Sequence, residues 1–203
     1  MSNKIKISKM NFDETISSSL ELAQKIEKKR FEPNGVIGIA IGGILPAHII
    51  SNYFRCPLIL IRVARPITTV KKYFSLNKLP IPAKRFLRNM EMNLGLYRRM
   101  EARKITEICG KLSKRRYIVV DDSLDTGKTV HAVLKFLENE KRIKRKDVLI
   151  AVLTQMYDDA NPQADCLIHN NVNFSFPWSR DSNEYNKFLN FCRDIPISDS
   201  IYL

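Results

Sequence analysis

The sequence predicts an α/β protein built on a doubly wound, mostly parallel sheet. Short, continuously apolar runs alternate along the chain with segments of helical spacing, and glycine or proline turns separate them. Continuous apolar runs are typical of strands that are buried on both faces, and a βαβ rhythm builds a parallel sheet with right-handed crossovers. The expected strands are VIGIAI (36–41), PLILIRVA (57–64), RYIVVD (116–121) and DVLIAVLTQM (147–156).

The helices that complete this pattern follow from apolar spacing and end signals. In residues 11–30, Ile16, Leu20, Ala23 and Ile26 fall at helical spacing, and Asp13 is the expected N-cap. A helix is also expected from about Leu96 to near Gly110. The remaining helices are expected at 42–54, 128–142 and 182–194, and short extended pieces at 165–178.

Length and composition are those of a soluble globular protein with one domain, residues 1–203. Hydrophobic residues make up 44% of the chain and charged residues 27%. No apolar run approaches the roughly 20 residues of a membrane span, and the polar first residues lack a signal-peptide core. We therefore expect a cytoplasmic protein. The four cysteines form no CxxC pair, which predicts free thiols rather than a zinc site.

Most of the net charge of +13 is concentrated in one quarter of the chain. Residues 66–116 contain 14 Lys and Arg against three acids, so 14 − 3 = +11. Clustered prolines and basic residues predict a lid or insertion here. It could attract anionic ligands, form a homodimer or higher homo-oligomer through its apolar residues, bind nucleic acid, or be a solvated face.

The stretch YIVVDDSLDTGKTV (117–130) carries the clearest chemistry. Asp121 and Asp122 end a strand, where a parallel sheet binds ligands, and Asp125 begins a turn into a helix. A helix start with Gly127 is a natural phosphate seat, and adjacent carboxylates accept hydrogen bonds from hydroxyls. A sugar phosphate satisfies both halves. A nucleoside triphosphate P-loop would need glycine where Asp122 stands, and a plain surface turn leaves two carboxylates at the end of an apolar strand unexplained.

This stretch resembles the PRPP loop of type I phosphoribosyltransferases, PRPP being 5-phosphoribosyl-1-pyrophosphate. The closest resemblance is to the hypoxanthine-guanine and xanthine enzymes, and it extends over all but the N-terminal helix and the basic segment. It implies the type I phosphoribosyltransferase fold with a small hood, residues 154–186. It also implies that PRPP is bound by Asp121, Asp122, Asp125, Thr126, Gly127, Lys128 and Thr129.

Two further stretches agree with the resemblance. GIAIGGILPA (38–47) is similar to the pyrophosphate loop, and FPW (176–178) with DSNEY (181–185) is similar to the hood. The implied pyrophosphate-binding residues are Ile41, Gly42, Gly43, Arg65 and Lys187. The implied base-binding residues are Gln155, Phe174 and Trp178, and those implied to hold Mg²⁺ are Asp181, Asp121 and Asp122.

The resemblance predicts an enzyme of purine salvage. It would transfer the phosphoribosyl group from Mg²⁺-bound PRPP to a nitrogenous base, in expectation a purine, with release of pyrophosphate and with Asp125 as general acid or base. The sequence departs from the family at Ile41, usually basic, and at Gln155, usually lysine. These departures leave an alternative open: a non-catalytic regulator that senses PRPP or nucleotides and binds nucleic acid through the basic insertion.

Overall fold

The computed structural model describes residues 7–64, 103–113, 116–195 and 201. The chain divides into two compact units, one of residues 1–63 with 105–203 and one of residues 64–104. The first unit holds nearly all the described residues and all the elements that surround the predicted site. Of the predicted basic insertion, residues 66–102 and 114–115 lie outside the described residues.

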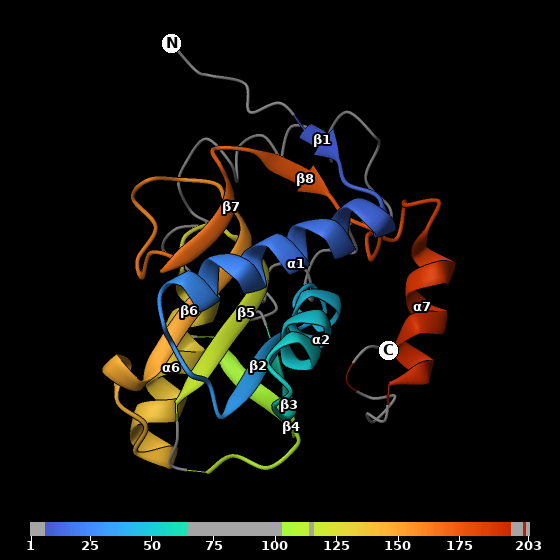
Figure 1. Cartoon of the computed structure of the whole chain (residues 1–203). Helices are drawn as coiled ribbons and strands as arrows, with labels where there is room; N and C mark the ends of the chain where they lie inside the picture. The colour runs from blue at the N-terminus through green and yellow to red at the C-terminus, as the bar shows by residue number, and fades with distance from the viewer. Residues whose placement is uncertain (1–6, 65–102, 114–115, 196–200, 202–203) are drawn as a thin grey trace, which may run out of the picture. The chain divides into compact units, whose positions relative to one another are not determined.

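The first unit is built on a six-stranded sheet with the strand order β4-β3-β2-β5-β6-β7 (Figure 1). The pairs β2–β3, β2–β5, β5–β6 and β6–β7 are all parallel, which confirms the expected doubly wound sheet. The strands are β2 (Gly35–Ala40), β3 (Leu58–Ala64), β4 (Lys104–Cys109), β5 (Tyr117–Leu124), β6 (Val148–Gln155) and β7 (Cys166–Asn170).

Helices cover both faces of this sheet because successive strand residues point to opposite sides. Val36, Ile118 and Val120 belong to the core under α1 (Phe12–Lys28) and α2 (Ile44–Tyr53). Their neighbours Ile37 and Val119 belong to the core under α6 (Lys128–Lys141). Burial on both faces explains why these strands read as continuous apolar runs.

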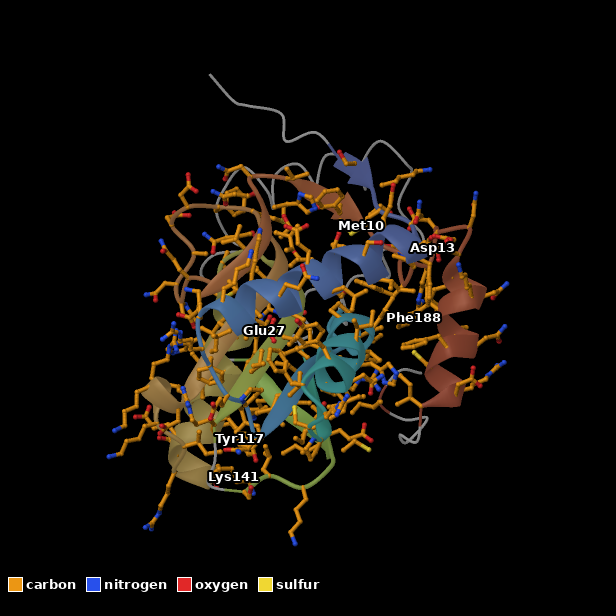
Figure 2. The ribbon with its side chains drawn as sticks, in the orientation of Figure 1. Met10, Asp13, Glu27, Tyr117, Lys141 and Phe188 are labelled. Carbon is orange, nitrogen blue, oxygen red and sulfur yellow. The ribbon has the colours of Figure 1, made fainter. Side chains whose placement is uncertain are left out.

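Three smaller pieces complete the unit. Strand β1 (Ile7–Lys9) pairs in parallel with β8 (Asn173–Ser175) as a separate two-stranded sheet. Helix α7 (Tyr185–Asp194) packs through Phe188 and Cys192 against Ile44 and Leu45 of α2. Figure 2 shows Phe188 on the side of α7 that faces α2. A short 3-10 turn, η2 (Arg145–Asp147), precedes β6.

The structure corrects the expected helix from Leu96 to Gly110. Residues 104–109 form strand β4, and the part before residue 103 lies outside the described residues. Exposure alternates residue by residue along β4, with Lys104 and Thr106 exposed and Ile105 half-buried. This period of two, with β-branched residues, is that of a strand with one face against the protein and one face exposed.

The limits of two other elements also differ from expectation. The N-cap of α1 is Asn11 rather than Asp13, because the Asn11 side chain accepts a hydrogen bond from the Glu14 N–H at 2.8 Å and the Glu14 carboxylate accepts one from the Asn11 N–H at 2.8 Å. This reciprocal capping box fixes the start of the helix. Leu20, expected on the buried face, is 41% exposed. Strand β5 runs three residues past Asp121, because β6 stays paired with it as far as Leu124 and Gln155.

All four cysteines, Cys56, Cys109, Cys166 and Cys192, are free thiols, as predicted. Burial raises the pKa of the Cys192 thiol to about 12. Cys192 therefore belongs to the apolar packing between α7 and α2 rather than to any reactive site.

Candidate active site

The two adjacent carboxylates lie near the carboxyl end of β5. Asp121 is only 8% exposed and pairs with Val152 of β6 in the ladder. Its Oδ1 accepts a hydrogen bond from the backbone N–H of Asp122 at 3.0 Å. Burial of a carboxylate in an apolar sheet costs free energy unless polar groups compensate it. The pair is therefore a polar centre in an otherwise apolar strand.

Beyond β5 the chain turns into α6 through a glycine that no other residue could replace without a shift. Gly127 has φ +79° and is the N-cap of α6. A Cβ at this position would lie 2.9 Å from the Pro162 nitrogen and would overlap the Asn161 carbonyl oxygen. The Asn161 N–H in turn donates to the carbonyl oxygen of Thr126 at 3.3 Å. The 156–164 loop thus packs on the turn, and the N-terminal end of α6 provides the partial positive charge that favours a phosphate.

The turn between β2 and α2 lies directly against the carboxylates. The peptide bond between Ala40 and Ile41 is cis, and Ile41 is partly exposed. A Cβ on Gly42 would overlap the Asp122 carboxylate, and one on Gly43 would lie 2.5 Å from the carbonyl oxygen of Val120. The structure therefore brings together the two loops that the sequence predicted as the pyrophosphate and PRPP loops.

The predicted hood contributes one side chain to this centre. The indole Nε1–H of Trp178 donates to Oδ2 of Asp122 at 2.7 Å. The Trp178 ring is stacked on Phe176, with centroids 4.8 Å apart and planes 8° apart. Phe174 lies further along the same row of rings, 5.9 Å from Phe176 and 4.8 Å from His169. Of the two aromatic candidates, Trp178 is the one in contact with the carboxylate pair.

Gln155 has a structural role that the sequence did not indicate. It is 5% exposed, its Nε2 donates to the carbonyl oxygen of Tyr157 at 3.2 Å, and its Oε1 accepts from the Ala164 N–H at 3.1 Å. The amide thus joins both ends of the 156–164 loop that packs on the Gly127 turn. A buried glutamine at the end of an apolar strand is the signal that could have suggested this role.

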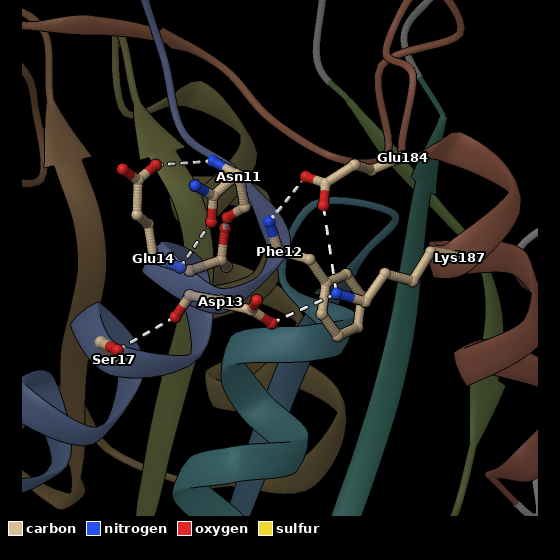
Figure 3. Close-up of polar contacts among 8 residues, drawn as sticks. Asn11, Phe12, Asp13, Glu14, Ser17, Glu184 and Lys187 are labelled. Atoms are coloured by element: carbon tan, nitrogen blue, oxygen red, sulfur yellow. Dashed lines mark hydrogen bonds and ion pairs between the residues drawn. The ribbon is translucent and has the colours of Figure 1, made fainter.

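The structure does not bring Lys187 to the two loops. Its Nζ lies 3.2 Å from Oδ1 of Asp13, 4.0 Å from Oε1 of Glu184 and 4.6 Å from the Phe12 ring centroid (Figure 3). Glu184 also accepts a hydrogen bond from the Phe12 N–H at 2.7 Å. This network joins the start of α7 to the start of α1.

Two further predicted ligand-binding residues are Asp181 and Arg65. Asp181 is exposed in the segment before α7, and Arg65 lies outside the described residues. Within the described part of the chain, no three His, Cys, Asp or Glu side chains gather to form a metal site. No helix in the same residues has the length and apolar composition to cross a membrane.

Three solved structures share this fold. A purine phosphoribosyltransferase from Pyrococcus horikoshii is 23% identical, with 85% of this chain and 95% of that chain covered and a TM-score of 0.59. A xanthine-guanine-hypoxanthine phosphoribosyltransferase from Helicobacter pylori is 21% identical, with 91% and 99% covered and a TM-score of 0.61. A hypothetical protein from Neisseria gonorrhoeae with bound ppGpp is 18% identical, with 95% and 100% covered and a TM-score of 0.61.

A search of curated proteins found no match. In contrast, the family model for the phosphoribosyl transferase domain matches residues 18–179, which include most of α1, the sheet, both glycine turns and Trp178. The chain therefore belongs to the phosphoribosyltransferase family of transferases, as the loop at Asp121–Thr129 indicated.

Proposed function

We propose that this phosphoribosyltransferase transfers the phosphoribosyl group of PRPP to a purine base and releases pyrophosphate. One observation carries the proposal: the Asp122 carboxylate lies between the glycine turn at Gly42 and the hood residue Trp178. From Asp122 the chain continues to the end of β5 and then to Gly127, where the N-terminal end of α6 can bind a phosphate. Such an arrangement suits a ligand with a pentose at its centre and phosphoryl groups on two sides.

The proposed PRPP contacts follow from the charge of each part of the ligand. The ribose hydroxyls are neutral donors, and they would donate to Asp121 and Asp122. The 5′-phosphate is anionic, and it would accept from the N–H groups and hydroxyls of the turn that includes Thr126 and Thr129. The pyrophosphate would accept from the backbone of the turn at Gly42. These assignments explain why carboxylates and a phosphate seat occur so close together in the sequence.

The base would bind beside the hood. Phe176 covers one face of the Trp178 indole, so a base stacked on Trp178 would use the opposite face. The purine assignment is supported by the names of two of the fold relatives, which are purine and xanthine-guanine-hypoxanthine phosphoribosyltransferases. If Gln155 also reads the base, its amide would use the second Nε2–H or the second Oε1 lone pair, because one of each is already bonded to Tyr157 and Ala164.

Asp125 is the proposed general acid or base. It is exposed at the start of the turn, between the ribose carboxylates and the phosphate seat. As pyrophosphate departs, positive charge develops on the ribose and a proton must leave the base nitrogen. A carboxylate placed beside both groups stabilises the charge and accepts the proton.

The donor set fits Mg²⁺. This ion is commonly held by one or two carboxylates together with substrate phosphate oxygens and water, so a cage of three protein ligands is not required. Asp121 and Asp122 would provide the protein oxygens. When bound, the ion would neutralise charge on the pyrophosphate. Asp181, exposed in the hood, is not adjacent to this pair in sequence and stays a prediction.

The test is pyrophosphate release from Mg²⁺ and PRPP with a panel of purines and pyrimidines, measured against a reaction without base to subtract hydrolysis. We expect release that depends on a purine and is paired with formation of its nucleotide. Release with pyrimidines alone would contradict the purine assignment. Silence across the panel would contradict the proposed reaction.

A further inference from the structure

The hydrogen bond between Trp178 and Asp122 joins the hood to the carboxylate pair across 56 positions of sequence. Its length of 2.7 Å is that of a strong bond from a neutral donor to a carboxylate. An indole has a single N–H and no acceptor, so its only polar capacity is committed to Asp122. The bond therefore gives this aromatic residue a function beyond packing.

The indole cannot turn freely, because buried rings support it. Phe176, 4% exposed, is stacked on it, and Phe188, fully buried, lies with its centroid 5.6 Å away at 56°. Both rings belong to the packed interior of the unit. The position of the N–H donor is therefore set by the core, and Asp122 must adapt to it.

A backbone turn also lies against the Asp122 carboxylate. The carboxylate lies so close to Gly42 that a Cβ there would overlap it, and the Asp122 N–H is bonded to Oδ1 of Asp121. The side chain is thus held between a backbone turn and an indole. Rotation of the carboxylate away from the indole would break the bond to Trp178.

We propose that Trp178 is a positioning residue for PRPP: its N–H fixes the Asp122 carboxylate in the orientation that accepts the ribose hydroxyls. The inference rests on the proposed function and adds a role that stacking on a base does not require. The same indole borders the proposed base position. Binding of the base beside the hood and binding of the ribose by Asp122 therefore become energetically coupled. Each ligand would then strengthen the binding of the other.

The test variant is Trp178→Phe, which keeps an aromatic ring but removes the donor. Loss of one hydrogen bond to a charged group predicts PRPP affinity about tenfold weaker, measured by calorimetry. Tyr53→Phe is the matched control, because the Tyr53 hydroxyl donates to Glu27 at the same 2.7 Å between the last turns of α2 and α1. That control should leave PRPP affinity unchanged.

A double variant separates positioning from general packing. When Asp122→Ala has already removed the acceptor, the additional Trp178→Phe change should alter PRPP affinity by less than about twofold. Effects that multiply would mean that the ring acts independently of Asp122, and the inference would be wrong. An equal loss in the Tyr53→Phe control would have the same meaning.

Trp178 is the only tryptophan in the chain, so the intrinsic tryptophan fluorescence of the unaltered protein reports on this residue alone. This measurement does not depend on whether the Trp178→Phe variant folds. Saturation of the unaltered protein with PRPP should change its emission, because hydroxyls arrive at the carboxylate bonded to the indole. Constant emission at saturation would overturn the inference. If Trp178→Phe keeps its PRPP affinity and still releases pyrophosphate with a purine, the inference alone is wrong. If the unaltered protein neither binds PRPP nor releases pyrophosphate, the proposed function is wrong as well.

Discussion

Replacement of Gly127 by alanine should damage PRPP binding much more than it damages the fold. At φ +79° the left-handed conformation costs a residue with a Cβ about 1–2 kcal/mol. For a chain of this size, that lowers the melting temperature by about 2–8 °C. The new Cβ would also lie 2.5 Å from the Asn161 carbonyl carbon, whereas ordinary contact begins at 3.4 Å, so turn and loop must separate by nearly 1 Å. A misplacement of about 1 Å in a binding turn is expected to lower kcat/KM for PRPP about 100-fold.

The control for this prediction is Gly110→Ala. Gly110 also has positive φ, +109°, but a Cβ added there would come no closer than 3.2 Å to Ile59 and Leu58, beside the edge of the sheet. Gly110→Ala should lose stability through its backbone conformation and retain PRPP kinetics. The assays are thermal unfolding and initial rates of pyrophosphate release at varied PRPP. Unchanged kcat/KM in Gly127→Ala, or an equal kinetic loss in both variants, would refute the assignment of this turn to phosphate.

Three further outcomes are expected. Asp125→Asn should bind PRPP within about threefold of the unaltered protein but lose about 10²- to 10⁴-fold in kcat, and single-turnover rates would detect any retained chemistry. Cys192, whose pKa is raised to about 12, should react with iodoacetamide at pH 8 roughly 10³-fold more slowly in the folded protein than in denaturant; rapid labelling of the folded protein would contradict its burial. Burial lowers the pKa of His48 from 6.5, so the unfolded chain binds the proton more readily and stability should fall as pH drops below about 6.5; His48→Gln should flatten that part of the stability profile, as measured by urea unfolding.

Local sequence determined much of the fold and the centre of the site. The strands around Val119 and Ile150 were recognisable because burial on both faces leaves continuous apolar runs. The position of Asp122 near the carboxyl edge of the sheet followed from the strand before it and the glycine turn after it. In these cases the structure depends on neighbours within a few residues, and a single chain records that information directly.

Contacts between distant segments were not predictable in the same way. Nothing near Trp178 in the sequence indicates that its donor meets Asp122, and nothing near Lys187 indicates that its cation meets Asp13 rather than an anionic ligand. The strand at 104–109 was missed because a basic, turn-poor segment is compatible with a helix until its pairing at the edge of the sheet is known. Tertiary context overrides intrinsic preference at such places.

Residues 7–12, at the start of the described part of the chain, are bonded to the start of α7 and to the segment that carries Trp178. Strand β1 pairs with β8, the Met10 N–H donates to the Ser175 carbonyl oxygen at 3.0 Å, and the Phe12 N–H donates to Glu184. Fusing a tag close to Ile7, or trimming the chain to the start of α1, would therefore loosen a region more than 160 positions away. For kinetic measurements an affinity tag is better placed away from the N-terminus, because a tag there would disturb the segment around Trp178, beside which the acceptor base is expected to bind.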